Sequence, residues 1–588
     1  MTTEVPPAAL FLVGALLVPL LRGNLRKGFV ILLPAAAFLL IVQLAPGSSW
    51  KLSFLGHELT LLRVDKLSKV FGYIFTLNAF AAFIYAFYLR DATQHVAALF
   101  YIGSALGVVF AGDLITLYLF WEVMAVASTM LILARKTKHS LGAGFRYILV
   151  HLAGGLCLLA GILVFINQTG TVAFDAMSEP SLATWLILIG FLVNAAAPPL
   201  HAWLSDAYPE ATVTGGVILS AYTTKTAVYT LIRGFPGWEI LIVIGCVMTL
   251  YGIIYALLEN DMRRILAYSI INQVGFMVTG VGIGTAMALN GAAAHAFCHI
   301  IYKSLLWMSA GSVLYMTGRS RCTDLGGLYK TMPWTLIFGT IGALAISSFP
   351  GTSGFTSKTL IINGSVQEHL VWVWLVLEIA SAGVFLHAGI KFPYFVFFAK
   401  DSGLRPGEAP RTMLLAMGFM AFLCIFLGVY PRPLYSILPF GEVHYQAYTF
   451  AHVLTQLQLL MLSALVFFLF LPLLKRTETI SLDTDWFYRK GGRLLYRLAD
   501  AVFNQINRLC EQYIAGELTR AINRFCRHAP VRLTSWLLLP LHRMGGSGTA
   551  RRDDYRETIQ AALNKGIVPI GLSAAASGLF LILLFYFS

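Results

Sequence analysis

The residues of this sequence that could move protons are ionisable side chains placed inside long apolar runs. A charge at membrane depth costs about 2.5–3.5 kcal/mol on insertion scales, so each such group needs a partner or a function. Ionisable groups on separate helices can relay protons by coupled titration. The predicted proton pathway consists of Glu122, Lys225, His295, His299, Lys303 and Lys358.

Three of these residues lie close together in the sequence. His295, His299 and Lys303 fall at i, i+4 and i+8 and therefore share one face of a helix. Imidazoles exchange protons near neutral pH, which suits a relay; the alternative is a pair of hydrogen-bonded core histidines. No metal is expected, because Ala296 stands where an HExxH motif has its glutamate and no third ligand is evident.

Glu122 lies in the apolar stretch DLITLYLFWEVMAVAS, where a cationic partner would be needed to hold its carboxylate ionised. A purely structural role for this carboxyl group is the alternative. Five further residues are candidate accessory groups: Asn194, Asp113, Glu378, His387 and Lys391. Lys391 could instead extend its amine to the inner surface of the membrane.

Two apolar runs are interrupted next to the predicted lysines. The run 183–199 ends at a Pro-Pro pair, which lacks two backbone donors, and a Gly-Gly pair then opens a second run that carries Lys225 near its middle. The other interruption is IGALAISSFPGTSGFTSKT, residues 341–359. Broken helices at membrane depth need cover by protein or water, and paired breaks indicate inverted repeats. The alternative is a kinked packing helix with a snorkelling lysine.

The composition indicates an all-α polytopic membrane protein. Of 588 residues 58% are hydrophobic and 12% are charged, which excludes a soluble globular protein. About sixteen apolar runs could span a bilayer, and the first is expected to be a retained span, not a cleaved signal peptide. Basic residues alternate between loops, which predicts an inner (cytoplasmic) membrane protein with both termini on the outer side.

The net charge of +14 resides mainly in loops and a C-terminal segment, so lipid headgroups explain it better than nucleic acid. The seven cysteines form no CxxC pair, which disfavours iron–sulfur and zinc sites. The sequence also lacks a phosphate-binding loop, a dinucleotide fingerprint, a haem motif and a nucleophile elbow. The chain is therefore expected to bind no cofactor and to perform no redox chemistry itself.

The C-terminal part differs from the rest. Residues 477–563 are basic and amphipathic, with leucines at helical spacing. They indicate a lateral helix along the cytoplasmic face of the membrane or along a partner subunit; packed cytoplasmic helices are the alternative. The other predicted divisions are 1–92 (N-terminal transmembrane helices), 93–234 and 235–400 (two repeats), 401–476 (additional transmembrane helices) and 564–588 (a last transmembrane anchor).

Several long motifs resemble the antiporter-like subunit family, which is shared by respiratory complex I, Mrp-type cation/proton antiporters and the membrane arms of energy-converting hydrogenases. They are DLITLYLFWE (113–122), PPLHAWLSDA (198–207), KTAVY (225–229), DMRRILAYSIINQVG (261–275), HAFCHIIYKSLLWMSAG (295–311) and FPGTSGFTSK (349–358). The resemblance covers roughly residues 60–400, and the motifs follow the family's order.

The resemblance implies two inverted five-helix repeats, each with a broken helix, joined by a polar axis across the membrane. It also implies that the amphipathic segment is similar to the lateral helix of the largest complex I antiporter-like subunit. The site residues carry over motif by motif: Glu122 as the glutamate of the first half-channel, Lys225 as the lysine after the first break, His295, His299 and Lys303 as the central relay, and Lys358 as the ionisable residue of the second break.

Three positions depart from the family pattern. The family usually has a lysine at the position of Asn194, facing the glutamate. Arg263 stands where lysine is common, and Ser205 replaces a proline. The neutral Asn194 removes the expected partner of Glu122, so the first half-channel could be uncoupled, differently coupled or served by Lys225.

The sequence therefore predicts a membrane subunit that translocates protons, with or without Na⁺. Its expected partners are other membrane subunits, lipids and the transported ions, within an NADH:quinone oxidoreductase-like, hydrogenase-like or Mrp antiporter complex. One alternative is a mainly structural subunit that pumps nothing. The other is the membrane partner of an inorganic-carbon uptake complex.

Overall fold

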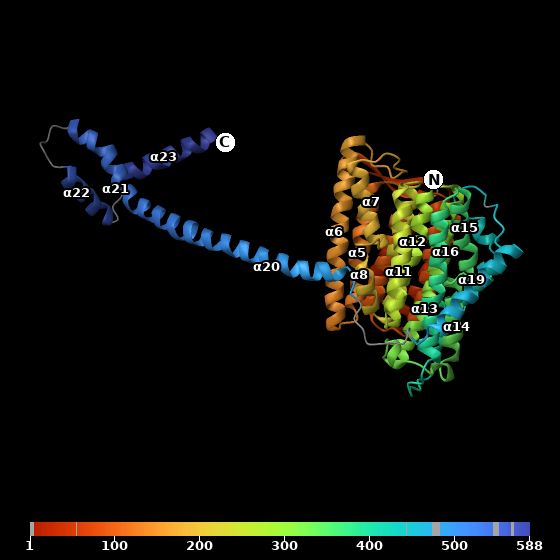
Figure 1. Cartoon of the computed structure of the whole chain (residues 1–588). Helices are drawn as coiled ribbons and strands as arrows, with labels where there is room; N and C mark the ends of the chain where they lie inside the picture. Colours follow the sequence, from red (N-terminus) through yellow and green to blue (C-terminus); the bar gives the residue numbers. More distant parts are fainter. Residues whose placement is uncertain are drawn as a thin grey trace. The chain divides into compact units, whose positions relative to one another are not determined.

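The structure is a computed structural model that describes residues 5–54, 56–442, 444–472, 482–544, 552–565 and 570–587. The chain divides into two compact units, Met1–Asp485 and Trp486–Ser588. The first unit is a helical bundle, and the second holds most of α20 (Asp485–Cys510) and the helices that follow it (Figure 1). The boundary predicted at residue 477 lies outside the described residues.

Long helices, most of them strongly apolar, build the bundle. In chain order they are α1 (Pro7–Leu17), α2 (Gly23–Gln43), α3 (Lys66–Tyr85), α4 (Ala92–Phe110), α5 (Leu114–Leu133), α6 (Lys138–Thr169), α7 (Leu182–Ala195), α11 (Ile240–Leu258), α12 (Met262–Ile283), α13 (Ala286–Thr317), α14 (Pro333–Ile346), α15 (Ser353–Gln367), α16 (Val371–Val384), α17 (Arg411–Val429) and α19 (Phe450–Leu469). Shorter helices complete it: α8 (Ala202–Ala207), α9 (Val213–Leu219), α10 (Thr223–Gly234) and α18 (Arg432–Tyr435).

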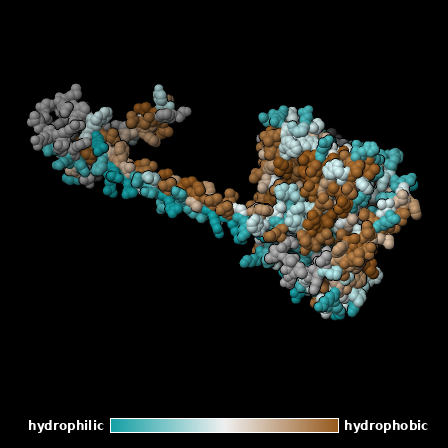
Figure 2. Space-filling model, in the orientation of Figure 1, coloured by the Kyte–Doolittle hydropathy of each residue, from teal (hydrophilic) through white to brown (hydrophobic). Residues whose placement is uncertain are grey.

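The described residues contain 10 helices that are long and apolar enough to cross a membrane. Figure 2 shows hydrophobic side chains over much of the visible side of the bundle and hydrophilic ones toward its ends. The chain is thus a polytopic, mostly helical membrane protein. The predicted count of about sixteen spans is larger, partly because α7 and α14 each stop at an interruption and fall short of a full span.

One part of the bundle is not helical, which corrects the prediction of a purely helical chain. β1 (Gly47–Phe54) and β2 (His57–Val64) form an antiparallel hairpin. On β2 the Thr60 backbone N–H donates to Asp113 Oδ2 at 2.7 Å, and Asp113 Oδ1 accepts from the Thr116 N–H at 2.7 Å. Asp113 therefore caps α5 and ties the hairpin to it.

α11 and α12 approach each other closely because glycines line their contact. A Cβ atom at Gly275 would lie 2.7 Å from Gly245 O and 2.7 Å from the Thr249 N, and a Cβ at Gly252 would lie 2.6 Å from the Asn272 N. Small residues let helix backbones come together in this way, and packing then replaces the hydrophobic effect as the stabilising force inside a membrane.

Replacing Gly275 with Leu is therefore expected to destabilise the bundle, because the added side chain meets backbone atoms that cannot rotate away. Overpacking of this kind costs about 1–3 kcal/mol or more. The thermal unfolding midpoint of the detergent-solubilised protein is the measurement. Gly28→Leu is the matched control, because a Cβ at Gly28 on α2 meets nothing within 4 Å. Equal midpoints for the two variants would contradict the prediction.

The interruptions lie where the sequence predicts them, with one correction. α7 ends at Ala195, and Ala196 adopts a left-handed conformation with φ of 60° before the Pro-Pro pair. The following run, however, is itself broken between α9 and α10, at residues 220–222. Lys225 therefore lies in the first turn of α10, not in the middle of one helix as predicted. The second interruption separates α14 from α15.

The second unit is also helical where it is described. α20 passes into a π-helical stretch, Glu511–Leu518, and α21 (Thr519–Met544), α22 (Arg552–Asn564) and α23 (Ile570–Phe587) follow. Figure 2 shows hydrophobic and hydrophilic residues on opposite edges of α20, as the predicted amphipathic pattern requires.

Candidate functional site

Lys225 is fully buried at the break between α9 and α10. Its Nζ donates to Ser220 O at 2.6 Å and to Thr224 Oγ1 at 3.1 Å. The Thr223 N–H, also released by the break, donates to Tyr101 Oη at 2.9 Å. Protein side chains therefore satisfy the backbone groups that the break exposes, which is the condition for non-helical backbone at membrane depth.

Lys358 is placed in the same way at the second interruption. Its buried Nζ donates to Ile346 O at 3.0 Å, and Ile346 is the last residue of α14. The amine also lies 5.0 Å from the centroid of the Phe276 ring. Each of the two lysines thus donates to a carbonyl oxygen at a helix break, where the helix dipole favours a cation.

His295 on α13 contacts the residue that precedes Lys358. Its Nδ1 is 3.1 Å from Ser357 Oγ, and its Nε2 is 3.0 Å from Gln273 Oε1. Tyr302 Oη also donates to Gln273 Oε1 at 3.1 Å. Because Ser357 precedes Lys358, the hydrogen bonds of His295 lead directly toward the second interruption.

His299 and Lys303 continue the row along α13 toward Lys225. Both side chains have no solvent exposure, and the two imidazole nitrogens and the amine have no hydrogen-bond partner within the described ranges. The rings of His295 and His299 are 6.3 Å apart. Lys225 interacts electrostatically with both His299 and Lys303. The alternative of two hydrogen-bonded core histidines therefore fits His295 and does not fit His299.

Glu122 and Asn194 lie apart from this row. Glu122 is half-buried on α5, and its Oε1 lies against Gly155 of α6 so closely that a Cβ there would overlap it. No hydrogen-bond partner for this oxygen is found in the described part of the chain, and the same holds for both amide atoms of Asn194. No ion pair of Glu122 occurs among the described residues.

The accessory candidates divide into two groups. Lys391, in a π-helical segment Phe385–Lys391, is buried and donates to Ala256 O, Leu257 O and Glu259 O at 2.6–2.8 Å. It caps the end of α11 and does not reach the surface. Like Asp113, it has the contacts of a structural residue. His387 and Glu378 both lie within electrostatic reach of Lys358.

Asp483 is a buried acid that the sequence analysis did not single out. Its carboxylate accepts from Tyr251 and Tyr268, lies 3.1 Å from His201 Nε2 and accepts from Ser205 Oγ at 3.4 Å. Burial alone would raise the pKa of Asp483, but the hydrogen bonds and the charge of His201 hold that pKa well below its usual value. No spacing signal in the sequence connects residue 483 with residue 201.

Arg263, one of the departures from the family pattern, holds the segment before α9. Its Nη1 donates to Pro209 O at 2.7 Å and to Ala211 O at 2.9 Å, and its Nη2 donates to Thr212 O at 3.1 Å. The planar guanidinium presents these donors from two nitrogens in a fixed fork, whereas a lysine amine is a single donor centre. Arg263 is thus a positioning residue for the segment that enters α9.

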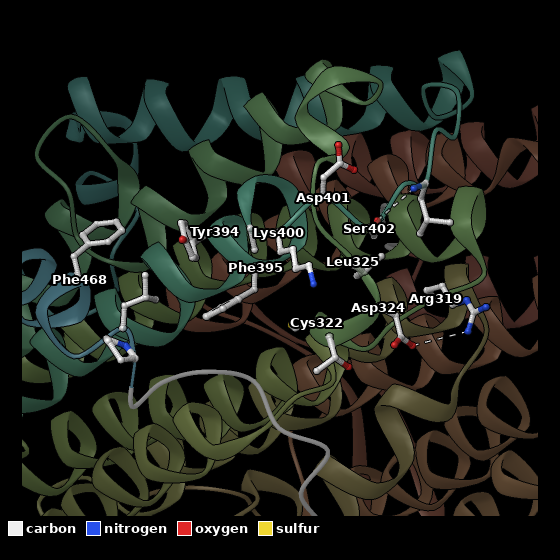
Figure 3. Close-up of a pocket in the computed structure, with 15 residues that line it drawn as sticks. Arg319, Cys322, Asp324, Leu325, Tyr394, Phe395, Lys400, Asp401, Ser402 and Phe468 are labelled. Carbon is white, nitrogen blue, oxygen red and sulfur yellow. Dashed lines mark hydrogen bonds and ion pairs between the residues drawn. The ribbon is translucent and has the colours of Figure 1, made fainter.

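A cavity of about 980 Å³ opens at another place in the bundle, next to Arg319, Lys400 and Tyr394. Figure 3 shows the ion pair that Arg319 forms with Asp324 at its edge. None of the predicted pathway residues lines it. Within the described ranges, no group of at least three His, Cys, Asp or Glu side chains could hold a metal ion.

The family described as "NADH:quinone oxidoreductase/Mrp antiporter, TM" matches residues 111–383. NADH-quinone oxidoreductase subunit N of Desulforudis audaxviator is 31% identical over 467 residues, which cover 71% of this chain and 92% of that protein. A Na⁺/H⁺ antiporter subunit of Alkalihalophilus pseudofirmus is 30% identical over 492 residues, or 72% of this chain and 61% of that protein.

A solved structure shares the fold. A chain of the membrane-bound sulfane sulfur reductase, an archaeal respiratory membrane complex, superimposes with a TM-score of 0.69 at 24% identity. The match covers 92% of this chain and 99% of that chain. The chain spans 41%, 62% and 61% of the length of the first three curated relatives that it matches.

Proposed function

Because this chain belongs to the NADH:quinone oxidoreductase/Mrp antiporter family, we propose that it is an ion-translocating subunit of a multisubunit membrane complex. One observation carries the proposal. Buried amines and imidazoles extend from Lys225 to Lys358, and the groups in the middle of the row, His299 and Lys303, have no hydrogen-bond partner among the described residues. Charges that only stabilise a protein interior are normally paired.

The row suggests how protons would move. Two neighbouring cations repel strongly in a low-dielectric interior, so a proton added to Lys225 would favour proton loss from Lys303 or His299. His295 and its partner Ser357 would carry the proton on to Lys358. The carbonyl oxygens of Ser220 and Ile346 stabilise each terminal amine when it is charged.

The finer architecture is also a proposal. The two interruptions would belong to inverted five-helix repeats at 93–234 and 235–400, preceded by N-terminal helices and followed by the additional helices. The segment 477–563 would lie laterally on the cytoplasmic face and bind neighbouring subunits and lipids, and 564–588 would anchor it. Both termini would lie on the outer side of the inner membrane, and protons, with or without Na⁺, would be the transported ions.

A mainly structural role is the second candidate, and Asn194 favours it. The resemblance places a lysine at that position, and without it the buried Glu122 oxygen has no hydrogen-bond partner within the described residues. A structural role would not require the buried amine of Lys303, however, and that difference separates the two functions.

The test replaces Lys303 with Ala in the assembled complex and measures proton and Na⁺ movement in sealed vesicles. Proton-transfer groups typically contribute about 10²–10⁴-fold in rate, so we expect translocation to fall at least about tenfold while the complex still assembles. Lys138→Ala is the control, because Lys138 is exposed at the start of α6. Unchanged ion movement in an assembled Lys303→Ala complex would refute ion translocation and favour the structural role.

A further inference from the structure

His151 on α6 is a buried titratable residue that the row described above does not include. Its side chain is 1% exposed. The Nδ1 atom lies 2.9 Å from Tyr147 O, and since a carbonyl oxygen can only accept, Nδ1 carries the hydrogen. Nε2 has no hydrogen-bond partner in the described part of the chain. The backbone therefore fixes the tautomer that leaves Nε2 free to take up a proton.

Two other polar side chains without hydrogen-bond partners in the described ranges, Glu122 and Asn194, lie on α5 and α7, the helices that pack against α6. Glu122 lies against Gly155, one helical turn from His151 on the same face of α6. Asn194 follows Val193, whose side chain packs against Gly154, the residue before Gly155 on α6. Glu122 Oε1, His151 Nε2 and the Asn194 amide are all buried without partners among the described residues. Four such atoms on three packed helices are unusual, because buried polar atoms are normally satisfied.

The surroundings hold the imidazole in place without using Nε2. The Tyr147 ring stacks on it with centroids 3.9 Å apart, and the Trp203 ring meets it edge-on at 4.5 Å. Trp203 is fixed in turn, since its Nε1 donates to Val193 O at 2.9 Å. The charged pair nearest in sequence, Arg146 and Asp206, forms a two-pronged contact at 2.7 and 3.0 Å and is mutually neutralised.

A cluster of hydroxyl groups includes neighbours of both His151 and Lys225. Tyr147 Oη lies 2.9 Å from Ser128 Oγ. Thr223 Oγ1 is 2.6 Å from Tyr101 Oη, and Tyr208 Oη is buried without a hydrogen-bond partner in the described part of the chain. The next residue, Thr224, accepts the hydrogen bond from Lys225 Nζ. Hydroxyl groups both donate and accept, so such a cluster can transmit a proton.

We propose that His151 carries protons between Glu122 and Lys225, in place of the lysine that the family resemblance implies at the position of Asn194. The proton binds Nε2 from the Glu122 side and leaves the same atom toward the hydroxyl cluster, while Nδ1 stays bonded to Tyr147 O. No other bond forms or breaks. This inference rests on the proposed function and names a further residue of the same path.

The test measures ion translocation by the assembled complex with His151→Phe, which keeps the stacking and removes the nitrogen. We expect a loss of at least about tenfold, a cautious bound for a type of group that contributes about 10²–10⁴-fold in rate. His95→Phe is the matched control, since His95 on α4 is 2% exposed and lies outside the path. Adding Asn194→Lys to the His151→Phe variant is expected to restore transport, because the lysine would again face Glu122.

Three outcomes would overturn the inference. Lys303→Ala is measured in parallel and should lose transport if the chain translocates ions. Loss of transport in Lys303→Ala together with full transport in His151→Phe would show that His151 is not on the path. His151→Gln, which can hydrogen-bond but not titrate, must also lose transport, and full activity in this variant would equally exclude His151. Failure of both His151 variants to assemble would assign a structural role to the residue. Unchanged transport in Lys303→Ala would instead refute the proposed function itself.

Discussion

Replacing Lys225 with Arg is expected to stop most ion translocation while the chain still folds and assembles. A guanidinium group can keep the donor contacts to Ser220 O and Thr224 Oγ1 that cover the helix break. It does not release its proton at any accessible pH. The variant thus separates the two roles of Lys225, capping the break and exchanging protons. We expect a fall of at least about tenfold at every pH measured.

The measurement compares ion movement in sealed vesicles across a range of pH. Lys138→Arg controls for a change from lysine to arginine elsewhere in the bundle. If Lys225→Arg moved ions at the parental rate, the amine would act only as a fixed cation that supports the break, and the relay would not include it. Loss of assembly in the Arg variant would show that shape, not titration, decides the effect.

Replacing Asp483 with Ala is expected to cause the largest loss of stability among the substitutions considered. The change leaves the hydroxyls of Tyr251 and Tyr268 and the imidazole of His201 without their acceptor. Each buried donor left without a partner costs about 1–3 kcal/mol. The substitution also removes the side-chain acceptor of the Thr484 N–H, one of the two bonds by which Thr484 holds the chain before α20.

The stabilisation by Asp483 should depend on pH in one direction. Its pKa in the folded protein is lowered, so the stabilisation is complete above the ordinary aspartate pKa of about 3.9 and is lost as the pH falls below it. Thermal unfolding midpoints of the parent protein and Asp483→Ala should therefore converge on acidification. Asp324→Ala is the control, since Asp324 is partly exposed and its ion pair with Arg319 is 3.9 Å long. A constant difference between the midpoints at all pH values would contradict this assignment.

The fold was predictable where the sequence carries strong local signals. The Pro-Pro pair and the FPG motif predict the two main interruptions, because proline removes a backbone donor. The break before Lys225 was missed, since SAYTT at 220–224 contains neither proline nor glycine. The hairpin at 47–64 does carry a sequence signal, because polar and apolar residues alternate around Gly56. This signal lies between two apolar runs, and the expectation of a purely helical chain did not include it.

The sequence predicts which residues belong to the candidate site, but it does not predict which residues they contact. Lys225, Lys303 and Lys358 stand out because a lysine in an apolar run is rare. His151 and Asp483 do not stand out in the sequence, because a single histidine or aspartate carries no spacing pattern. The contacts of Asp483 with His201, Tyr251 and Tyr268 join residues more than two hundred positions apart in the chain.

The sequence by itself determined that this protein is a polytopic helical membrane protein with buried ionisable groups beside broken helices. Those properties follow from apolar run lengths, from prolines and from the cost of a charge in hydrocarbon. Only the tertiary structure decided which group has a partner: Lys391 caps α11, His295 is hydrogen-bonded, and Lys303 and His151 Nε2 have no hydrogen-bond partner among the described residues. The reason is physical, because the free energy of a buried polar group depends on neighbours within a few ångströms, and those neighbours come from helices far apart in the chain.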